Sequence, residues 1–229
     1  MGFRLPLSKE LSPGARIRIV EAAGEIFAEQ GFAKATIRKI CARAHVNIAL
    51  VSYHFGDKEG LYLEVMKYFR AKALEEYPPE VGPGESSPPE QRLSVFIRSL
   101  LFRLLSQGRT SFFWKLFARE FIEPTRAFEV MVNESIGPAY NLLMGIVRDL
   151  IGQEHDDTTV RFCAASIVGQ CLYYRNSREV IKRIIGKENF SASEIEEIAS
   201  HITKFSLAAM RSCYGRRLRE EPCGQTRAV

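Results

Sequence analysis

Apolar side chains recur at helical spacing along nearly the whole of this chain, and no segment alternates polar and apolar residues as a half-buried strand does. The clearest case follows Ser191 and Glu194, whose side chains can bond to the free backbone N–H groups at a helix start. Ile195, Ile198 and Ile202 then follow at a 3-4 spacing. Because this spacing places the three side chains on one face of a helix, we expect an all-α protein.

A proline-rich segment divides the chain into two unequal parts. Residues 77–91 hold five prolines, two glycines and two serines, so we expect a loop with no helix there. In front of it the pattern predicts a small domain at 13–57 and a connecting helix at 58–76. Behind it we expect a larger helical domain at 92–214 and a flexible basic tail at 215–229. The helices expected in the larger domain cover residues 90–107, 110–122, 125–151 with an interruption near Gly137 and Pro138, 157–175 and 192–213.

Composition and motif content exclude several classes of protein. No apolar run reaches the ~20 residues that cross a bilayer, and the first residues show no signal peptide, so we expect a cytoplasmic protein without a membrane partner. The four histidines show no metal-binding spacing. The chain also carries no nucleophile elbow, phosphate loop or triad-like motif. We therefore expect neither enzymatic activity, nor a cofactor, nor a metal site.

The five cysteines are scattered and lack CxxC spacing, which favours free thiols in a reducing compartment. Cys163 and Cys171 lie eight residues apart, near one face of the helix expected at 157–175. A redox-sensing pair is one interpretation of this spacing. Small side chains in the core are the interpretation that we favour.

The stretch from Thr36 to Leu61 carries the strongest functional signal. Two short helices are joined by a tight turn at residues 44–46, and the second helix begins at Asn47, a good N-cap. This is the arrangement of a helix-turn-helix, in which the second helix enters the major groove of DNA. The residues expected to form its interior are Ile40, Val46, Val51, Phe55 and Leu61.

The second helix of this motif is only two turns long, and the side chains left for its outer side include apolar ones. Such a surface suits contact with thymine methyl groups and base edges. The alternative is that Ile48 and Leu50 pack against the first helix. Tyr53 and His54 could likewise form a packed helix end with no DNA role. The expected outer set is Asn47, Ile48, Leu50, Ser52, Tyr53 and His54.

Basic residues surround this helix, with five of them against one acid between residues 34 and 58. A local excess of this kind is typical of a surface that contacts phosphates. A solvated helix face is the alternative for the arginines and lysines of the first helix. The basic set is Lys34, Arg38, Lys39, Arg43 and Lys58.

Two stretches of the motif resemble the TetR family of regulators closely: GFAKATIRKICARA at 31–44 and YHFGDKEGLY at 53–62. The resemblance implies a three-helix DNA-binding head, a connecting fourth helix and an all-helical C-terminal domain. His45 departs from the family pattern, because glycine is usual at this turn; histidine tolerates a positive φ at a cost of about 1 kcal/mol. The match implies phosphate contacts for Thr36, Tyr53, His54 and Lys58. The full set of DNA-contacting residues expected is Thr36, Arg38, Asn47, Ile48, Ala49, Leu50, Ser52, Tyr53, His54 and Lys58.

Three stretches of the larger domain are similar to the CecR-like (YbiH-like) subgroup of that family: AREFIEPT at 118–125, IGPAYNLLMGIVRDLIG at 136–152 and ASIVGQCLYYRNSREVI at 165–181. The likeness implies a sensor domain that binds a small organic molecule. Aromatic walls with a few polar anchors are typical of such a site, although an aromatic cluster at helical spacing is also typical of a plain core. The candidate ligand-binding residues are Phe113, Trp114, Phe117, Arg119, Glu120 and Tyr173, with Phe112 beside them.

One head contacts about one half-site, so operator binding calls for two heads and hence for a homodimer. We expect its interface on the helices at about 157–175 and 192–213. On the first of these, small Ala165 and Gly169 permit close approach. The alternative is that the apolar stripes of both helices face only the protein's own core. The side expected to meet the partner carries Val160, Ala164, Ile167 and Cys171.

Taken together, these patterns predict a dimeric, ligand-responsive transcriptional regulator. We expect it to act as a repressor that binds double-stranded operator DNA and is released by an unknown small organic effector. The alternative is a helix-turn-helix protein with a non-specific DNA-binding or protein-binding role and no small-molecule ligand.

Overall fold

The computed structural model describes residues 13–78, 87–107 and 110–214, and every regular element within these ranges is helical. The expectation of an all-α protein is therefore confirmed. The tail predicted at 215–229 lies outside the described residues. The elements are α1 (Pro13–Lys34), α2 (Ile37–Ala44), α3 (Ile48–Phe55), α4 (Lys58–Glu76), α5 (Pro89–Leu105), α6 (Thr110–Glu120), α7 (Arg126–Met131), a π-helical turn (Val132–Ile136), α8 (Gly137–Ile151), α9 (Asp157–Asn176), α10 (Arg178–Ile185) and α11 (Ala192–Tyr214).

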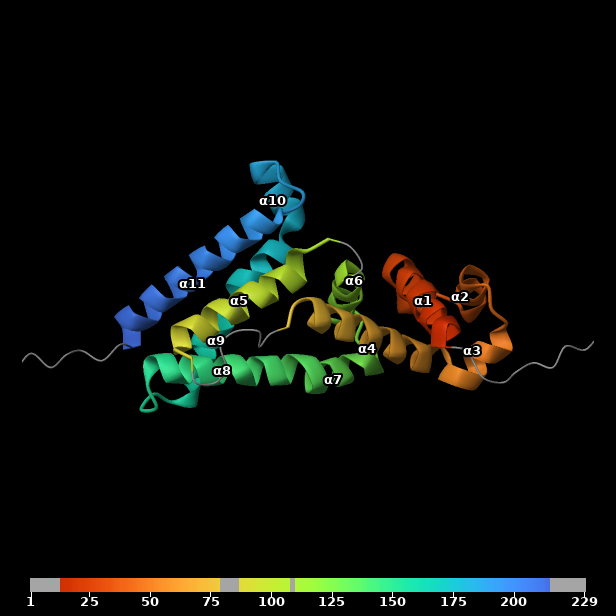
Figure 1. Ribbon diagram of the computed structural model, residues 1–229, viewed down its shortest axis with the longest axis horizontal. Coiled ribbons are helices and arrows are strands. Elements are labelled where there is room, and N and C mark those ends of the chain that lie inside the picture. Colours follow the sequence, from red (N-terminus) through yellow and green to blue (C-terminus); the bar gives the residue numbers. More distant parts are fainter. Residues whose placement is uncertain (1–12, 79–86, 108–109, 215–229) are drawn as a thin grey trace, which may run out of the picture.

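Helices α1, α2 and α3 form a small bundle, the head, at one end of the molecule (Figure 1). Its centre is apolar, because Phe27 of α1, Ile40 of α2 and Leu61 of α4 are fully buried there. Gly31 interrupts α1 with a φ of 78° and a ψ of 166°, a conformation that favours glycine. The chain consequently turns from α1 toward α2 at this glycine.

Helix α4 leads from the head to the remaining helices (residues 89–214), which we call the sensor domain after the role that the sequence leads us to expect (Figure 1). Helix α5 lies at its centre and contacts α6, α8, α9 and α11. Four of its apolar side chains, Leu93, Ile97, Leu101 and Leu104, recur at the 3-4 spacing and are buried. Helix α11 runs along the outer side of this domain and ends far from the head, whereas α10 lies near its start (Figure 1).

Three details of the sensor domain refine or correct the expectations. Helix α5 begins at Pro89, inside the predicted loop, because proline is tolerated in the first turn of a helix. The interruption expected near Gly137 is a π-helical turn at Val132–Ile136, directly before this residue, and Gly137 itself has helical φ and ψ. Helix α10 was not predicted, because it is only eight residues long and buries one large side chain, Ile181.

Our prediction of which side of α9 meets a partner is wrong. Val160, Ala164, Ile167 and Cys171 are all buried in the protein's own core, as the alternative interpretation holds. The outer side of α9 instead carries exposed Phe162 and Tyr173. Between them along the helix lie exposed Ala165 and Gly169, the two small residues expected to permit close approach.

Within residues 13–78, 87–107 and 110–214, no helix combines the length and the apolar character that a bilayer span needs.

Candidate nucleic-acid interface

The turn between α2 and α3 is held by local hydrogen bonds. His45 has a φ of 55° and a ψ of 48°, a left-handed conformation that explains why the family usually has glycine here. Its N–H donates to the Ala42 carbonyl at 3.4 Å, and the N–H of Val46 donates to the Cys41 carbonyl at 3.0 Å. These bonds satisfy the last carbonyls of α2 and set the direction in which α3 leaves.

A side chain caps the start of each helix of the motif, and for the second helix this is Asn47, as the sequence predicts. The Thr36 hydroxyl accepts a hydrogen bond from the N–H of Lys39 at 3.3 Å. The Asn47 side chain accepts one from the N–H of Ala49 at 2.9 Å. Because a threonine hydroxyl can also donate and the asparagine amide keeps both N–H donors, each cap can still contact a nucleic acid.

Helix α3 packs one side inward and presents the other to solvent. Val51 and Phe55 are buried against the head, and Val46 packs beside them, which confirms the predicted interior. Ile48 is 47% exposed and Tyr53 is 64% exposed. Ala49 and Ser52 are also exposed, whereas Leu50 and His54 are half-buried. An apolar and aromatic surface of this kind on a two-turn helix is unusual without a partner.

Several side chains of the basic set are already paired with other residues of the head, which the charge count alone does not show. Arg43 forms ion pairs with Glu25 and Glu29 of α1, both at 3.4 Å. Lys39 donates to the Gln30 side chain at 2.8 Å. Among the DNA-contact candidates, Arg38 is exposed and forms no ion pair with any described residue.

Lys58, predicted to hold a phosphate, contacts the end of α1 and the turn that follows. Its ammonium donates to the carbonyls of Phe32, Ala33 and Ala35 at 3.0, 3.4 and 3.3 Å. It also lies 4.4 Å from the centre of the Phe32 ring. These contacts attach the start of α4 to the turn before α2, a structural task that the sequence did not indicate.

Helix α6 connects the sensor domain directly to the head, since it contacts both α1 and α4. The Arg119 guanidinium donates to the carbonyls of Ala28 and Glu29 near the end of α1, both at 3.4 Å. Arg119 and Glu120 were expected as polar anchors of an effector. In the structure, Arg119 instead binds α1 and Glu120 binds α4.

The Glu120 carboxylate is 1% exposed and accepts hydrogen bonds from α4 and from the loop that precedes α7. Tyr62 of α4 donates its hydroxyl to Oε1 at 2.7 Å. Thr125, just before α7, donates its N–H to Oε2 at 2.9 Å and its hydroxyl to the same carboxylate. Burial raises the pKa of Tyr62, and the hydrogen bond to Glu120 raises it further, so the phenol stays protonated as the donor.

The aromatic candidates for the effector site are spread over different surroundings. Trp114 is buried, and Phe117 packs edge-on against it with ring centres 4.7 Å apart. Tyr173 lies on the exposed side of α9. The side chain of Phe113 lies outside the described residues.

Arg103 is a charged residue of the sensor domain that the sequence analysis did not identify as a candidate. It is 9% exposed, and its Nε donates to the Ser99 carbonyl at 3.3 Å. Its Nη2 is buried and has no hydrogen-bond acceptor among the described residues. Burial lowers the pKa of Arg103 to about 10, so it remains a cation at neutral pH. A single arginine within the apolar run Leu100–Leu105 is the signal that could have identified it.

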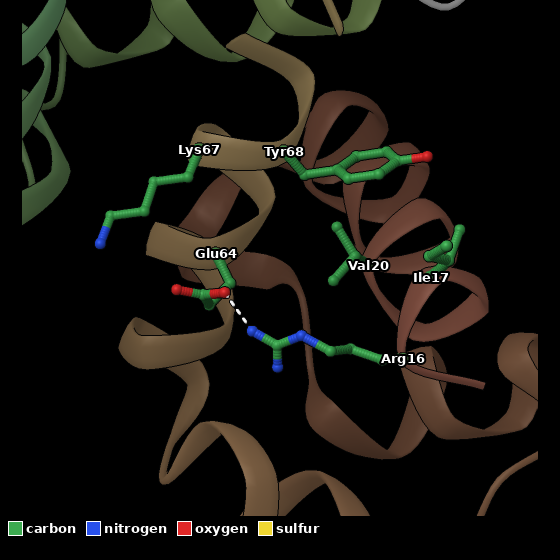
Figure 2. Close-up of a pocket in the computed structure, with 6 residues that line it drawn as sticks. All are labelled: Arg16, Ile17, Val20, Glu64, Lys67 and Tyr68. Carbon is green, nitrogen blue, oxygen red and sulfur yellow. Dashed lines mark hydrogen bonds and ion pairs between the residues drawn. The ribbon is translucent and has the colours of Figure 1, made fainter. Parts of the chain in front are cut away.

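One hollow of about 290 Å³ lies between α1 and α4, within the part of the protein that carries the head (Figure 2). The ion pair between Arg16 and Glu64 crosses one side of it. Because both walls belong to α1 and α4, this hollow is separate from the aromatic region of α6. Its lining residues are Arg16, Ile17, Val20, Glu64, Lys67 and Tyr68.

Comparison with known families places this geometry in one class. Residues 19–65 match the bacterial regulatory proteins of the TetR family, and residues 89–210 match the C-terminal domain of the HTH-type transcriptional dual regulator CecR. The chain is therefore a TetR-family helix-turn-helix transcriptional regulator, from a family of regulators rather than of enzymes. Within that family it belongs to the branch that carries the CecR C-terminal domain.

Individual relatives agree with this assignment. CecR of Shigella flexneri is 29% identical over 199 residues, which are 82% of this chain and 88% of that protein. The repressor Rv3405c of Mycobacterium tuberculosis is 39% identical over 69 residues, 30% of this chain and 35% of its own. A crystal structure of a transcriptional regulator from Pseudomonas aeruginosa shares the fold with a TM-score of 0.65 and 21% identity, over 91% of this chain and 99% of its own.

Removing the hydroxyl that Tyr62 donates to Glu120 tests the contact between the domains. We expect Tyr62→Phe to lower the free energy of unfolding by about 1–3 kcal/mol, because it leaves a buried carboxylate oxygen short of a donor. The measurement is urea unfolding followed by circular dichroism. Tyr53→Phe is the matched control and should leave the curve unchanged, since Tyr53 is exposed. Superimposable curves for Tyr62→Phe and the wild type would show that the hydrogen bond from Tyr62 to Glu120 does not stabilise the protein.

Proposed function

We propose that this regulator is a dimeric repressor that binds operator DNA through α3 and leaves it when a small organic effector binds the sensor domain. The observation that carries the proposal is the outward face of α3, where Ile48 and Tyr53 lie exposed beside Ser52. The name of the mycobacterial relative, a repressor, supports repression, whereas CecR, which matches far more of the chain, is named a dual regulator.

The residues of the motif divide between the DNA backbone and the bases. Thr36, Tyr53 and His54 contact phosphates, because a hydroxyl or ring N–H at this edge of the motif can donate to a phosphate oxygen. Arg38 adds a charge that is not used within the head. Lys58 contacts a phosphate only if it exchanges one of its three carbonyl partners. The base-facing set is Asn47, Ile48, Ala49, Leu50 and Ser52.

The dimer forms through the outer sides of α9 and α11. Phe162 and Tyr173 of α9 are 66% and 50% exposed, and Phe205 of α11 is 59% exposed. Large aromatic side chains beside small ones at Ala165 and Gly169 are typical of a close helix–helix interface. Helices from two subunits would pack there as a four-helix bundle.

The effector carries an acidic group that pairs with Arg103. A buried guanidinium with a free Nη2 costs stability unless an anion meets it. A second desolvated arginine, Arg175, lies near the same end of the sensor domain, since Gln107 after α5 and Arg178 after α9 both donate to the Asn189 side chain. Burial lowers the pKa of Arg175, and the nearby Arg178 lowers it further. This end of the domain therefore favours an organic anion.

Effector binding is coupled to the head through α6. Ligand selects an arrangement of α5 and α6 in which the contacts from Arg119 and Glu120 to α1 and α4 differ, and α4 then changes the position of the head. The coupling is a population shift, so it needs an effector that binds the two arrangements with different affinity.

Selection of bound DNA from a random library, followed by fluorescence anisotropy, tests the interface. We expect Tyr53→Phe to weaken binding about three- to tenfold on every sequence, because it removes one phosphate donor. Leu50→Ala should change the preferred sequence more than the total affinity. Tyr140→Phe, in α8, is the matched control. If the wild type selects no sequence, the protein is instead a non-specific DNA-binding or protein-binding one.

Sedimentation velocity tests the dimer. Phe205→Glu should convert the protein to monomers at micromolar concentration, because it places a charge in an apolar interface. Ile184→Glu, on the equally apolar outer side of α10, is the matched control and should stay dimeric. A dimer that survives Phe205→Glu would place the interface elsewhere.

Matched pairs of acids and amides test the effector class: benzoate with benzamide, octanoate with octanamide, and indole-3-acetate with indole-3-acetamide. We expect at least one acid to raise the melting temperature by a few degrees and to lower operator affinity, whereas its amide does neither. Arg103→Met should abolish both effects and keep operator binding. If no acid raises the melting temperature and lowers operator affinity more than its amide does, the proposal of an acidic effector is wrong.

A further inference from the structure

Helices α9 and α11 lie antiparallel, and two hydrogen bonds fix their register. Gln170 of α9 donates to the Ser206 hydroxyl of α11 at 3.3 Å. At the other end of α11, the carbonyl of Tyr214 lies 3.3 Å from Nε2 of His155, just before α9. Early residues of α9 therefore lie beside late residues of α11.

This register places two cysteines opposite each other. Cys163 lies seven residues before Gln170, and Cys213 lies seven residues after Ser206. Seven residues are two helical turns, so each cysteine occupies the same face of its helix as the bonded residue. A second observation agrees: burial raises the pKa of Cys163, and the negative charge of a nearby Cys213 thiolate raises it further.

The two thiols differ in access. Cys163 is 9% exposed, whereas Cys213 is exposed on the last turn of α11. An oxidant in solution can reach Cys213 directly, and Cys163 is shielded beside it. This combination of an open and a sheltered thiol is typical of a sensing cysteine with its resolving cysteine.

Cys171 does not fit a pair with Cys163. The two residues lie eight positions apart on one helix, which is about 12 Å along its axis, whereas a disulfide needs Cα atoms within about 7 Å. Cys171 is also fully buried, and burial raises its pKa to about 12. Of the two earlier interpretations, the core role holds for Cys171.

We propose that Cys163 and Cys213 form a modification site that hydrogen peroxide or an organic peroxide converts to a disulfide between α9 and α11. The Cys213 thiolate attacks the peroxide, its sulfur is oxidised to sulfenic acid, and the O–O bond breaks with release of hydroxide or alkoxide. The Cys163 thiolate then attacks the Cys213 sulfur, an S–S bond forms, and hydroxide leaves. The bond joins the two helices that carry the proposed dimer face.

The test uses the full-length protein treated with hydrogen peroxide, alkylated with N-ethylmaleimide, digested and analysed by mass spectrometry. We expect a cross-linked peptide pair that joins Cys163 to Cys213, is lighter by two hydrogens than the separate peptides and disappears with dithiothreitol. Cys163→Ser and Cys213→Ser should each abolish it. Cys171→Ser and Cys223→Ser are the matched controls and should leave its yield unchanged.

Two outcomes would overturn the proposal. One is oxidation of Cys213 to sulfinic acid while Cys163 remains alkylated, which would mean that no resolving thiol is in reach. The other is a cross-link from Cys213 to a different cysteine that persists in Cys163→Ser. Circular dichroism of each serine variant before oxidation confirms that the protein is folded.

Discussion

A buried carboxylate joins the part of this protein that meets DNA to the part expected to sense a ligand. Glu120 is almost fully removed from solvent, and its charge is offset by donors from Tyr62 and Thr125. Burial of such a charge without donors costs several kcal/mol. Tyr62 belongs to α4 and Glu120 to α6. The two helices therefore favour a few discrete positions in which the carboxylate keeps its hydrogen-bond donors, and they disfavour gradual sliding past each other.

The helix-turn-helix was predictable in detail because its determinants are local. Thr36 and Asn47 cap their helices through side chains that reach only two or three residues along the chain. The tight turn at residues 44–46 was also visible in the sequence, and His45 within it has a positive φ. The exposure of Ile48 and Tyr53 followed from helical spacing, since Val51 has to face inward.

The sensor domain was less predictable, because its determinants are tertiary. Helix α9 carries apolar residues on two sides, so periodicity alone did not tell the side of Ile167 from the side of Phe162. Likewise, the sequence marks Arg119 and Glu120 as polar residues beside aromatic ones, but not which carbonyls or hydroxyls they meet. Only the packing of α6 against α1 and α4 assigns them to the contact between the domains.

The internal pairing of the head's cations has a consequence for how the protein holds DNA at different ionic strengths. Arg43 and Lys39 are engaged by α1, and Lys58 by backbone carbonyls, so few charges remain to displace counterions from phosphates. Each neutralised phosphate adds about 0.9 to the slope of log affinity against log salt. We therefore expect a head of this kind to have a shallow slope and to depend more on shape and hydrogen bonding, so its binding to DNA should persist at high salt concentration.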